Sequence, residues 1–170
     1  RLATRVGAAT GITANLDFVR GASRKWMPLG QDIVIIGGEL VGIELAEFLH
    51  ERGRTVTVIE PAPRLGKGLL LVRRMRILSE LKEHGVELCG GAADIAITAD
   101  AVSFTAADGA VRSVRADHVI VAMGASGNPA LAERLRAEGY AVEAVGDCTG
   151  IGYIEGAIRG GADAARRLLA

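Results

Sequence analysis

The first half of the chain alternates short apolar runs with segments of helical spacing. Residues 32–37 (Asp-Ile-Val-Ile-Ile-Gly) are apolar and β-branched after the first position and end at glycine, which predicts a strand buried on both faces of a parallel sheet. Apolar residues then recur at three- and four-residue intervals until Gly53, which predicts a helix. A second β-branched run, residues 55–60, ends at Pro61 and completes a β-α-β unit. The inward-facing positions of this helix are expected to be Val41, Leu45, Phe48 and Leu49.

The alternation continues and is then interrupted by shorter runs. Residues 69–83 have helical spacing, and the run 86–89 predicts the next strand. Asp108-Gly109 lies between two alternating runs, which is a strong hairpin signal and predicts a small antiparallel meander. Residues 117–122 (Asp-His-Val-Ile-Val-Ala) then resume the buried parallel sheet. The expected inward positions of the 69–83 helix are Leu70, Met75, Leu78 and Leu81, and the expected meander strands are 95–98, 102–105 and 111–114.

The C-terminal part of the chain has a less regular pattern. It predicts a helix over residues 129–138, a strand around 141–145 that ends in Gly146-Asp147, and an alanine-rich helix over 153–169. Taken together, the order of elements predicts an α/β, Rossmann-like fold of three layers, with a central parallel sheet and a small antiparallel meander.

Composition and charge narrow the possible functions. The 170 residues include 20 basic and 20 acidic side chains, so no net charge attracts nucleic acid or an anionic membrane, and we expect neither as a partner. Cys89 and Cys148 stand far apart with no CxxC pair, which argues against a disulfide framework, a metal site or an iron–sulfur centre. This cysteine usage favours the reducing cytoplasm. No apolar run approaches the roughly 18 residues that a membrane span needs.

The most informative motif is the glycine-rich turn after the first strand. A dinucleotide-binding turn uses one glycine for the tight exit from the strand, a second for close approach of the pyrophosphate, and a third for helix packing. Gly37, Gly38 and Gly42 supply most of this frame, and Leu40 completes the turn. Glu39, however, stands at the middle position, where a carboxylate would face the pyrophosphate. Binding therefore requires Glu39 to turn away or to be bound by a cation.

An acidic residue at the end of the second strand adds a second signal. Glu60 lies 18 positions after Gly42, where such folds place a carboxylate that accepts hydrogen bonds from the adenosine ribose and repels a 2′-phosphate. This favours NADH over NADPH. Arg64 argues the other way, because it lies four residues later and could meet a 2′-phosphate. The alternative for Glu60 is a solvated carboxylate at a strand end that binds nothing.

Four motifs in order carry a resemblance to a known family. They are Ile-Val-Ile-Ile-Gly-Gly-Glu-Leu-Val-Gly at 33–42, Val-Thr-Val-Ile-Glu at 56–60, Val-Ile-Val-Ala-Met-Gly-Ala at 119–125 and Ala-Val-Gly-Asp-Cys at 144–148. From about residue 32 to its end, the chain resembles the C-terminal half of the multidomain NADH:flavin oxidoreductases related to 2,4-dienoyl-CoA reductase and trimethylamine dehydrogenase. In that family this half binds FAD and NAD(P)H, while an N-terminal FMN barrel reduces the substrate.

The resemblance implies cofactor contacts at particular positions. Met123 and Gly124 match the loop that closes the NAD(P)H domain. Gly146 and Asp147 match the FAD motif, although Asp147 has an alternative role as a helix N-cap or turn residue. The family's own FAD-domain glycine motif and its iron–sulfur cysteines are absent from this sequence. The implied cofactor-binding residues are Gly37, Gly38, Glu39, Leu40, Gly42, Glu60, Arg64, Met123, Gly124, Gly146 and Asp147, with Thr10 and Gly11 matching more loosely.

The same resemblance implies three segments. Residues 1–30 are expected to be a remnant of an FAD-domain strand with a linker, residues 31–126 an NAD(P)-binding Rossmann domain with its meander, and residues 127–170 the C-terminal segment of an FAD-binding domain. Because the chain starts at Arg1 with no initiator methionine, we expect a fragment of a longer parent, a processed product, or a sequence whose flanking segments are missing. The rest of the FAD domain and the FMN barrel of that parent would then be its partners.

Three functional hypotheses follow. The leading one is a nucleotide-binding domain of a flavin-dependent oxidoreductase, which passes hydride from NAD(P)H to flavin and needs no catalytic side chain. Such a chain is not expected to be active by itself. The alternative is a degenerate Rossmann domain that has lost binding through Glu39 and has a structural or protein-interaction role. A third is another Rossmann enzyme, such as a methyltransferase that binds S-adenosylmethionine.

Overall fold

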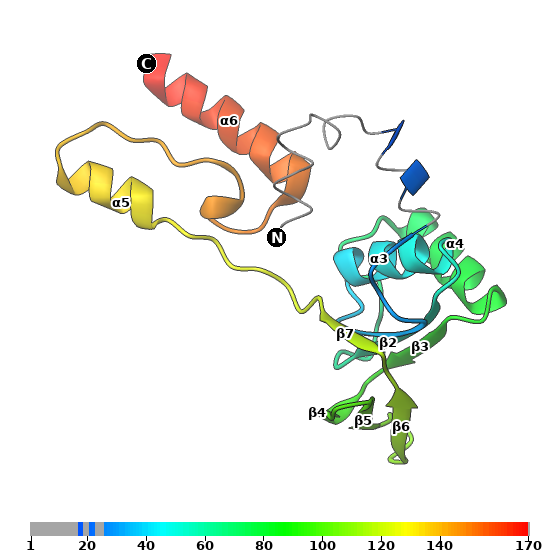
Figure 1. Ribbon diagram of the computed structural model, residues 1–170. Helices are drawn as coiled ribbons and strands as arrows, with labels where there is room; N and C mark the ends of the chain where they lie inside the picture. The colour runs from blue at the N-terminus through cyan, green and yellow to red at the C-terminus, as the bar shows by residue number, and fades with distance from the viewer. Residues whose placement is uncertain (1–16, 19–20, 23–25, 170) are drawn as a thin grey trace. The chain divides into compact units, whose positions relative to one another are not determined.

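The computed structural model describes residues 17–18, 21–22 and 26–169 (Figure 1). By their internal contacts the residues form two compact units, one ending at Met123 and the other running from Gly124 to the end of the chain. No helix among the described residues is both long enough and apolar enough to cross a membrane.

The first unit is built on a parallel sheet. Its four strands pair in the order β3-β2-β1-β7. The first strand, β1, is therefore an inner strand, with β2 on one side and β7, the last strand of the unit, on the other. β1 pairs in parallel with both neighbours, with Ile35 opposite Val58 of one and Ile120 of the other. The strands are β1 (Asp32–Ile36), β2 (Thr55–Glu60), β3 (Glu87–Gly90) and β7 (His118–Val121).

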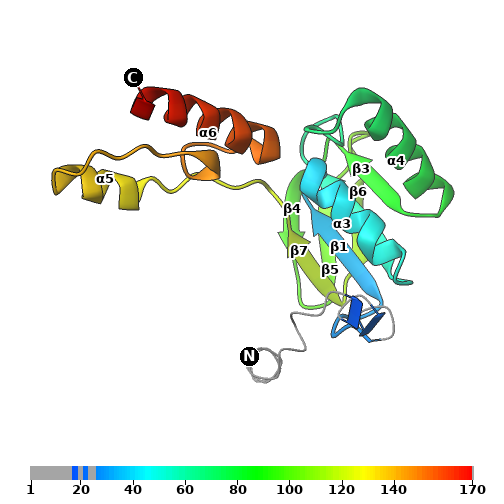
Figure 2. The ribbon, with the colours of Figure 1, turned by 90° about the horizontal axis from the view of Figure 1, so that it is seen from above.

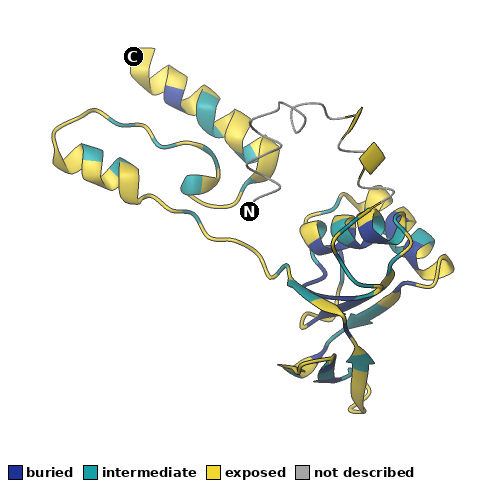
Figure 3. Ribbon diagram, viewed as in Figure 1, coloured by how far each residue is buried: buried dark blue, intermediate teal, exposed yellow. Residues whose placement is uncertain are grey.

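Two helices cover one face of this sheet, α3 (Leu40–His50) and α4 (Leu71–Glu83) (Figures 1 and 2). The strand residues on that face are fully buried, as the continuous apolar runs in the sequence predicted (Figure 3). This core contains Ile33, Ile35, Ile43, Ala46, Leu49, Val56, Val58, Ile77, Leu81 and Val86.

The inward faces of the two helices differ in part from the prediction. In α3, Leu49 is buried and Leu45 packs against the core, but Val41 and Phe48 are 54% and 40% exposed. The buried residues of the helix are Gly42, Ile43, Ala46 and Leu49, and the small ones let the helix approach the sheet closely. The prediction left out Ile43 and the two small residues and so placed the face about one position away.

The prediction for α4 fails in its N-terminal half. Leu81 is buried and Leu78 packs against the core, as expected, but Leu70 and Met75 are 83% and 67% exposed. Leu70 is the residue before the helix rather than part of it, and Ile77 takes the inward position.

A three-stranded antiparallel sheet lies on the other face of the parallel sheet. Its order is β4-β5-β6, and Asp108-Gly109 falls between the last two strands, so the predicted meander and its hairpin are confirmed. Val102 and Phe104 of β5 are buried with Val34 and Ile59 of the parallel sheet. Helices, parallel sheet and meander therefore form the predicted three layers. The meander strands are β4 (Ala93–Ile97), β5 (Ala101–Thr105) and β6 (Val111–Arg115).

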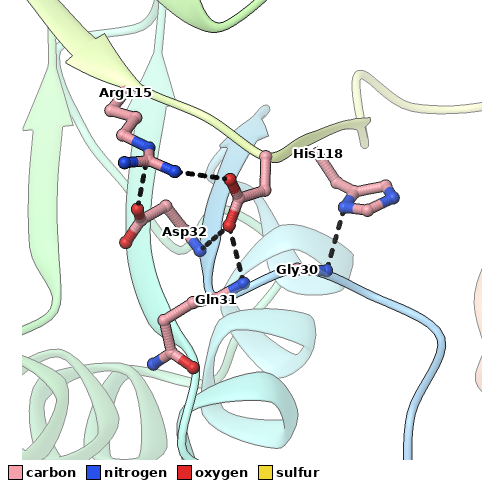
Figure 4. A network of polar contacts seen from close by, with 6 residues as sticks. Gly30, Gln31, Asp32, Arg115 and His118 are labelled. Atoms are coloured by element: carbon pink, nitrogen blue, oxygen red, sulfur yellow. Dashed lines mark hydrogen bonds and ion pairs between the residues drawn. The ribbon is translucent and has the colours of Figure 1, made fainter.

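A polar network fastens the amino-terminal edge of the parallel sheet (Figure 4). The carboxylate of Asp117 accepts hydrogen bonds from the backbone amides of Gln31 at 2.7 Å and Asp32 at 3.0 Å. Arg115 forms ion pairs with Asp117 at 3.1 Å and Asp32 at 3.3 Å. His118 Nδ1 accepts a hydrogen bond from the Gly30 amide at 3.0 Å. The segment before β1 is thus joined to the start of β7.

The second unit has little regular structure besides its helices. α5 (Ala130–Ala137) and α6 (Tyr153–Leu169) match the predicted helices, and a short 3₁₀ turn, η2 (Gly146–Cys148), precedes α6. The strand predicted around 141–145 is wrong, since this stretch pairs with no other strand among the described residues. The β-branched and small residues there have strand propensity, but a strand also needs a neighbour to share its backbone hydrogen bonds.

Candidate nucleotide-binding site

The glycine turn joins the end of β1 to the start of α3, at the carboxyl edge of the parallel sheet, where open α/β sheets bind ligands. Gly37 has a φ of +112°, and a Cβ built there would lie 2.4 Å from the carbonyl oxygen of Ala122. Only glycine permits this backbone conformation beside β7. The first glycine of the motif is therefore required by the fold itself.

Gly42 is required by the packing of the helix on the strand. A Cβ at this position would lie 1.8 Å from the carbonyl oxygen of Gly37. The helix thus begins directly against the end of β1, which is the contact that the third glycine of a dinucleotide-binding turn provides. Gly38 is less constrained, because a Cβ there would meet side-chain atoms of Leu65 at 2.9 Å and Glu60 at 3.0 Å.

Glu60 is buried and hydrogen-bonded at both carboxylate oxygens. Only 7% of the residue is exposed. Its Oε2 accepts a hydrogen bond from the Gly38 amide at 2.5 Å, and its Oε1 accepts one from the Ala62 amide at 2.7 Å. The alternative of a solvated strand-end carboxylate is therefore wrong. Glu60 therefore joins the end of β2 to the glycine turn. Each of its oxygens keeps a further lone pair that could accept from a ribose hydroxyl, so contact with a ribose stays a prediction.

The backbone amides of the turn are partly used by the protein. Gly37 donates to the Ile59 carbonyl and Leu40 to the Lys67 carbonyl, each at 2.8 Å. Within the described part of the chain, the amides of Val41 and Gly42 in the first turn of α3 have no acceptor. Unpaired amides at a helix N-terminus, together with the helix dipole, favour an anion.

Glu39 is the N-cap residue of α3 and is paired with a cation. Its backbone is extended, at φ −77°, so the turn does not need glycine here for its own conformation. Its carboxylate lies 3.1 Å from the ammonium nitrogen of Lys67. The sequence analysis allowed a cation-bound Glu39 but did not identify Lys67, which lies in the loop three residues beyond Arg64. Arg64 itself is exposed in that loop.

An apolar groove of about 450 Å³ opens at the same edge of the sheet. It is lined by Ile36 at the end of β1, Val121 at the end of β7 and Met123, together with Pro61, residues 92–95 and Ile97. Met123 is 59% exposed. The structure therefore places Met123 with the ends of β1 and β7, on the same sheet edge as the glycine turn.

The residues matched to FAD lie in the second unit. Gly146 has a φ of +76° and starts the 3₁₀ turn. Asp147 Oδ1 accepts hydrogen bonds from the amides of Gly152 at 2.9 Å and Tyr153 at 3.1 Å, so it caps the start of α6. This fits the alternative role foreseen for Asp147. Gly124 has a φ of +82° at the start of this unit, whereas Thr10 and Gly11 lie outside the described residues.

Comparison with known families decides between the classes of Rossmann protein. The model of the family described as pyridine nucleotide-disulphide oxidoreductase matches residues 6–161. The chain belongs to this family. Membership implies use of FAD and NAD(P)H, and the cradle formed by Gly37 and Gly42, with unpaired amides beside it, fits a dinucleotide pyrophosphate.

Members and related structures are much longer than this chain. A bilirubin reductase of Mediterraneibacter gnavus (strain CC55_001C) is 37% identical over 122 residues, which are 72% of this chain and 19% of that protein. An NADH oxidase of Thermoanaerobacter brockii is 29% identical over 133 residues, 77% of this chain and 20% of that protein. The structure of 2-naphthoyl-CoA reductase with 2-naphthoyl-CoA is 27% identical with a TM-score of 0.73, covering 79% of this chain and 21% of that one. The chain thus spans about a fifth of each.

Proposed function

We propose that this chain is the nicotinamide-dinucleotide-binding part of a flavin-dependent oxidoreductase similar to 2,4-dienoyl-CoA reductase and trimethylamine dehydrogenase. The observation that carries the proposal is the turn from Gly37 to Gly42, in which packing requires the first and the last glycine and the helix start offers unpaired amides. When bound, NAD(P)H would supply a hydride for transfer to flavin. The unpaired amides of Val41 and Gly42 would bind the pyrophosphate, while Gly37, Gly38 and Leu40, whose amides are hydrogen-bonded within the protein, would shape the turn around it. Met123 and Gly124 would lie toward the nicotinamide.

Similarity to larger reductases supports this assignment. In both the bilirubin reductase and the 2-naphthoyl-CoA reductase, the part that is similar to this chain makes up about a fifth of the protein. We propose accordingly that residues 31–126 form the NAD(P)-binding domain, and that residues 1–30 and 127–170 belong to an FAD-binding domain completed by the parent chain. Contacts with FAD would then form only in that longer protein, through Gly146, Asp147, Thr10 and Gly11. The proposed location of the longer protein is the cytoplasm.

NADH is the proposed dinucleotide. The buried carboxylate of Glu60 at the end of β2 would repel a 2′-phosphate, and it keeps acceptor sites for ribose hydroxyls. Arg64 is the exposed cation that would favour NADPH. Replacing Arg64 by alanine is therefore expected to lower affinity for NADPH and leave affinity for NADH unchanged.

The test is calorimetric titration of the chain with NADH, NADPH and FAD at one salt concentration. Micromolar binding of NADH, tighter than that of NADPH, is the expected result. S-adenosylmethionine serves as the control ligand, because binding of it in place of NADH would favour a methyltransferase.

A degenerate domain is the second candidate, favoured by the hydrogen bonds that already occupy the Gly37, Gly38 and Leu40 amides. The variant Glu39→Gly separates the two. If the wild type binds no dinucleotide and the variant gains affinity for NADH, the domain is degenerate. If the wild type already binds NADH, the degenerate hypothesis fails.

A further inference from the structure

A cation faces the one side chain of the glycine turn that is unfavourable for a pyrophosphate. Glu39 stands where the motif usually has glycine, and its Oε1 lies 3.1 Å from Lys67 Nζ. The Glu39 side chain is 36% exposed and that of Lys67 is 80% exposed. An ion pair this open contributes little to stability, so its significance lies in the local charge rather than in folding.

Backbone contacts, not the ion pair alone, hold Lys67 beside the turn. The Gly66 amide donates to the Gly38 carbonyl at 2.6 Å, and the Leu40 amide donates to the Lys67 carbonyl at 2.8 Å. These two bonds fasten the loop on either side of Glu39. Arg74 of α4 also donates from Nε to the Leu65 carbonyl at 2.7 Å. The loop after β2 is therefore docked on the turn in a way that places a cation next to Glu39.

Resting on the proposed function, we propose that Lys67 is a binding determinant that neutralises Glu39 and so makes this turn compatible with a dinucleotide pyrophosphate. The net charge of the pair is zero, as it would be with glycine at position 39. Removing the charge of Lys67 would give the pair a net charge of −1 beside a dianion, and removing the charge of Glu39 would give the pair a net charge of +1. Affinity should thus follow the net charge of the pair and not the presence of either residue.

Four proteins test this dependence: the wild type, Lys67→Met, Glu39→Gln and the double variant. One unit charge near a ligand in water changes affinity by about five-fold. We expect Lys67→Met to weaken NADH binding by about that factor, Glu39→Gln to strengthen it by a similar factor, and the double variant to return to the wild-type value. The differences should shrink as salt screens the charges.

The measurement is calorimetric titration of the full chain with NADH and with NADPH, at low and at high salt. Lys82→Met is the matched control, because Lys82 lies in the last turn of α4, about 16 Å along the helix axis from its start. Lys67→Arg keeps the charge and is expected to bind like the wild type. Far-ultraviolet circular dichroism checks that each variant is folded. If Lys67→Met does not fold, the comparison of Lys67→Arg and Glu39→Gln with the wild type still tests the dependence on charge.

The possible outcomes separate the inference from the function on which it rests. Equal losses for NADH and NADPH, with recovery in the double variant, support the inference. A double variant as weak as Lys67→Met shows that Lys67 acts through the loop or by direct contact, and a loss confined to NADPH shows contact with the 2′-phosphate. Either result overturns the inference. The proposed function still stands in both cases, provided that the wild type binds NADH. Absence of binding by both wild type and Glu39→Gln overturns both.

Discussion

Glu60 shows how one side chain can serve the fold and the candidate site together. Its carboxylate is buried and accepts hydrogen bonds from the amides of Gly38 and Ala62, so it fixes the glycine turn against the end of β2. The sequence predicted an acidic residue facing a ribose. It could not predict the bond to Gly38, because that contact joins residues 22 positions apart through the pairing of two strands.

Replacing Glu60 by glutamine should therefore destabilise the chain before any ligand is added. The glutamine amide group is a donor, so it cannot accept from one of the two backbone amides, and a charge-assisted bond is lost. We expect the free energy of unfolding to fall by roughly 1–3 kcal/mol in urea titrations. Glu83→Gln, at an exposed position at the end of α4, is the control. Equal stability of the two variants would show that the Glu60 bonds do not contribute.

Asp117 provides a prediction about pH. Hydrogen bonds from the Asp32 amide, then from the Arg115 side chain and the Gln31 amide, lower the pKa of this carboxyl below its ordinary value. A carboxyl with a lowered pKa in the folded state adds stability above its unfolded pKa, and this is lost as pH falls through the folded pKa.

The variant Asp117→Asn should therefore be less stable than the wild type at pH 7, and the difference should disappear in strong acid. Urea unfolding at pH 7, 5 and 3 measures it. Asp100→Asn, in the exposed turn before β5, is the comparison variant. A gap between wild type and Asp117→Asn that stays constant over this pH range would contradict the assignment.

At the scale of elements, the sequence predicted the buried strands and the meander well. Continuous β-branched runs have few alternatives to a strand covered on both faces, and Asp108-Gly109 specifies a hairpin locally. The helix faces were predicted less well, because Gly42 and Ala46 carry no apolar bulk to mark the buried side of α3. The cation beside Glu39 was missed for a related reason: the docking of a loop on a turn leaves no periodic signal.

Close approach of α3 to β1 predicts opposite effects for two glycine substitutions. In Gly42→Ala the new Cβ would lie 1.8 Å from the Gly37 carbonyl oxygen, so the backbone must shift. We expect a loss of about 1–3 kcal/mol or more in the free energy of unfolding, together with loss of NADH binding. Gly161 lies inside α6, and a Cβ there would meet nothing within 4 Å.

The variant Gly161→Ala should then favour the helix by about 1 kcal/mol and raise the far-ultraviolet helical signal. Thermal and urea unfolding of both variants, followed by circular dichroism, checks the contrast. Destabilisation by both substitutions would mean that the space around α6 is not open.

At the scale of the whole molecule, the two units differ in how completely they bury their apolar side chains. The first unit has two buried clusters on the two faces of its parallel sheet. In α6 the only described buried residue is Ala164, and Ile154 and Ile158 are 80% and 66% exposed (Figure 3). An amphipathic helix normally buries its apolar side against another element. Under the proposed function, in which a longer parent chain completes the FAD-binding domain, we expect the parent to supply that element.

Hydrogen exchange in the parent chain tests this expectation. Burying one isoleucine side chain contributes roughly 1.5–3 kcal/mol, so local opening of α6 should become at least about ten-fold rarer in the longer protein. Exchange measured by mass spectrometry should slow over residues 153–169 and stay unchanged over residues 33–36, which are already buried in this chain. The strand-like stretch 141–145 should gain protection as well if the parent offers it a neighbouring strand. Equal exchange of α6 in the two proteins would mean that its apolar side stays uncovered in the parent, and residues 127–170 would then not be the end of an FAD-binding domain.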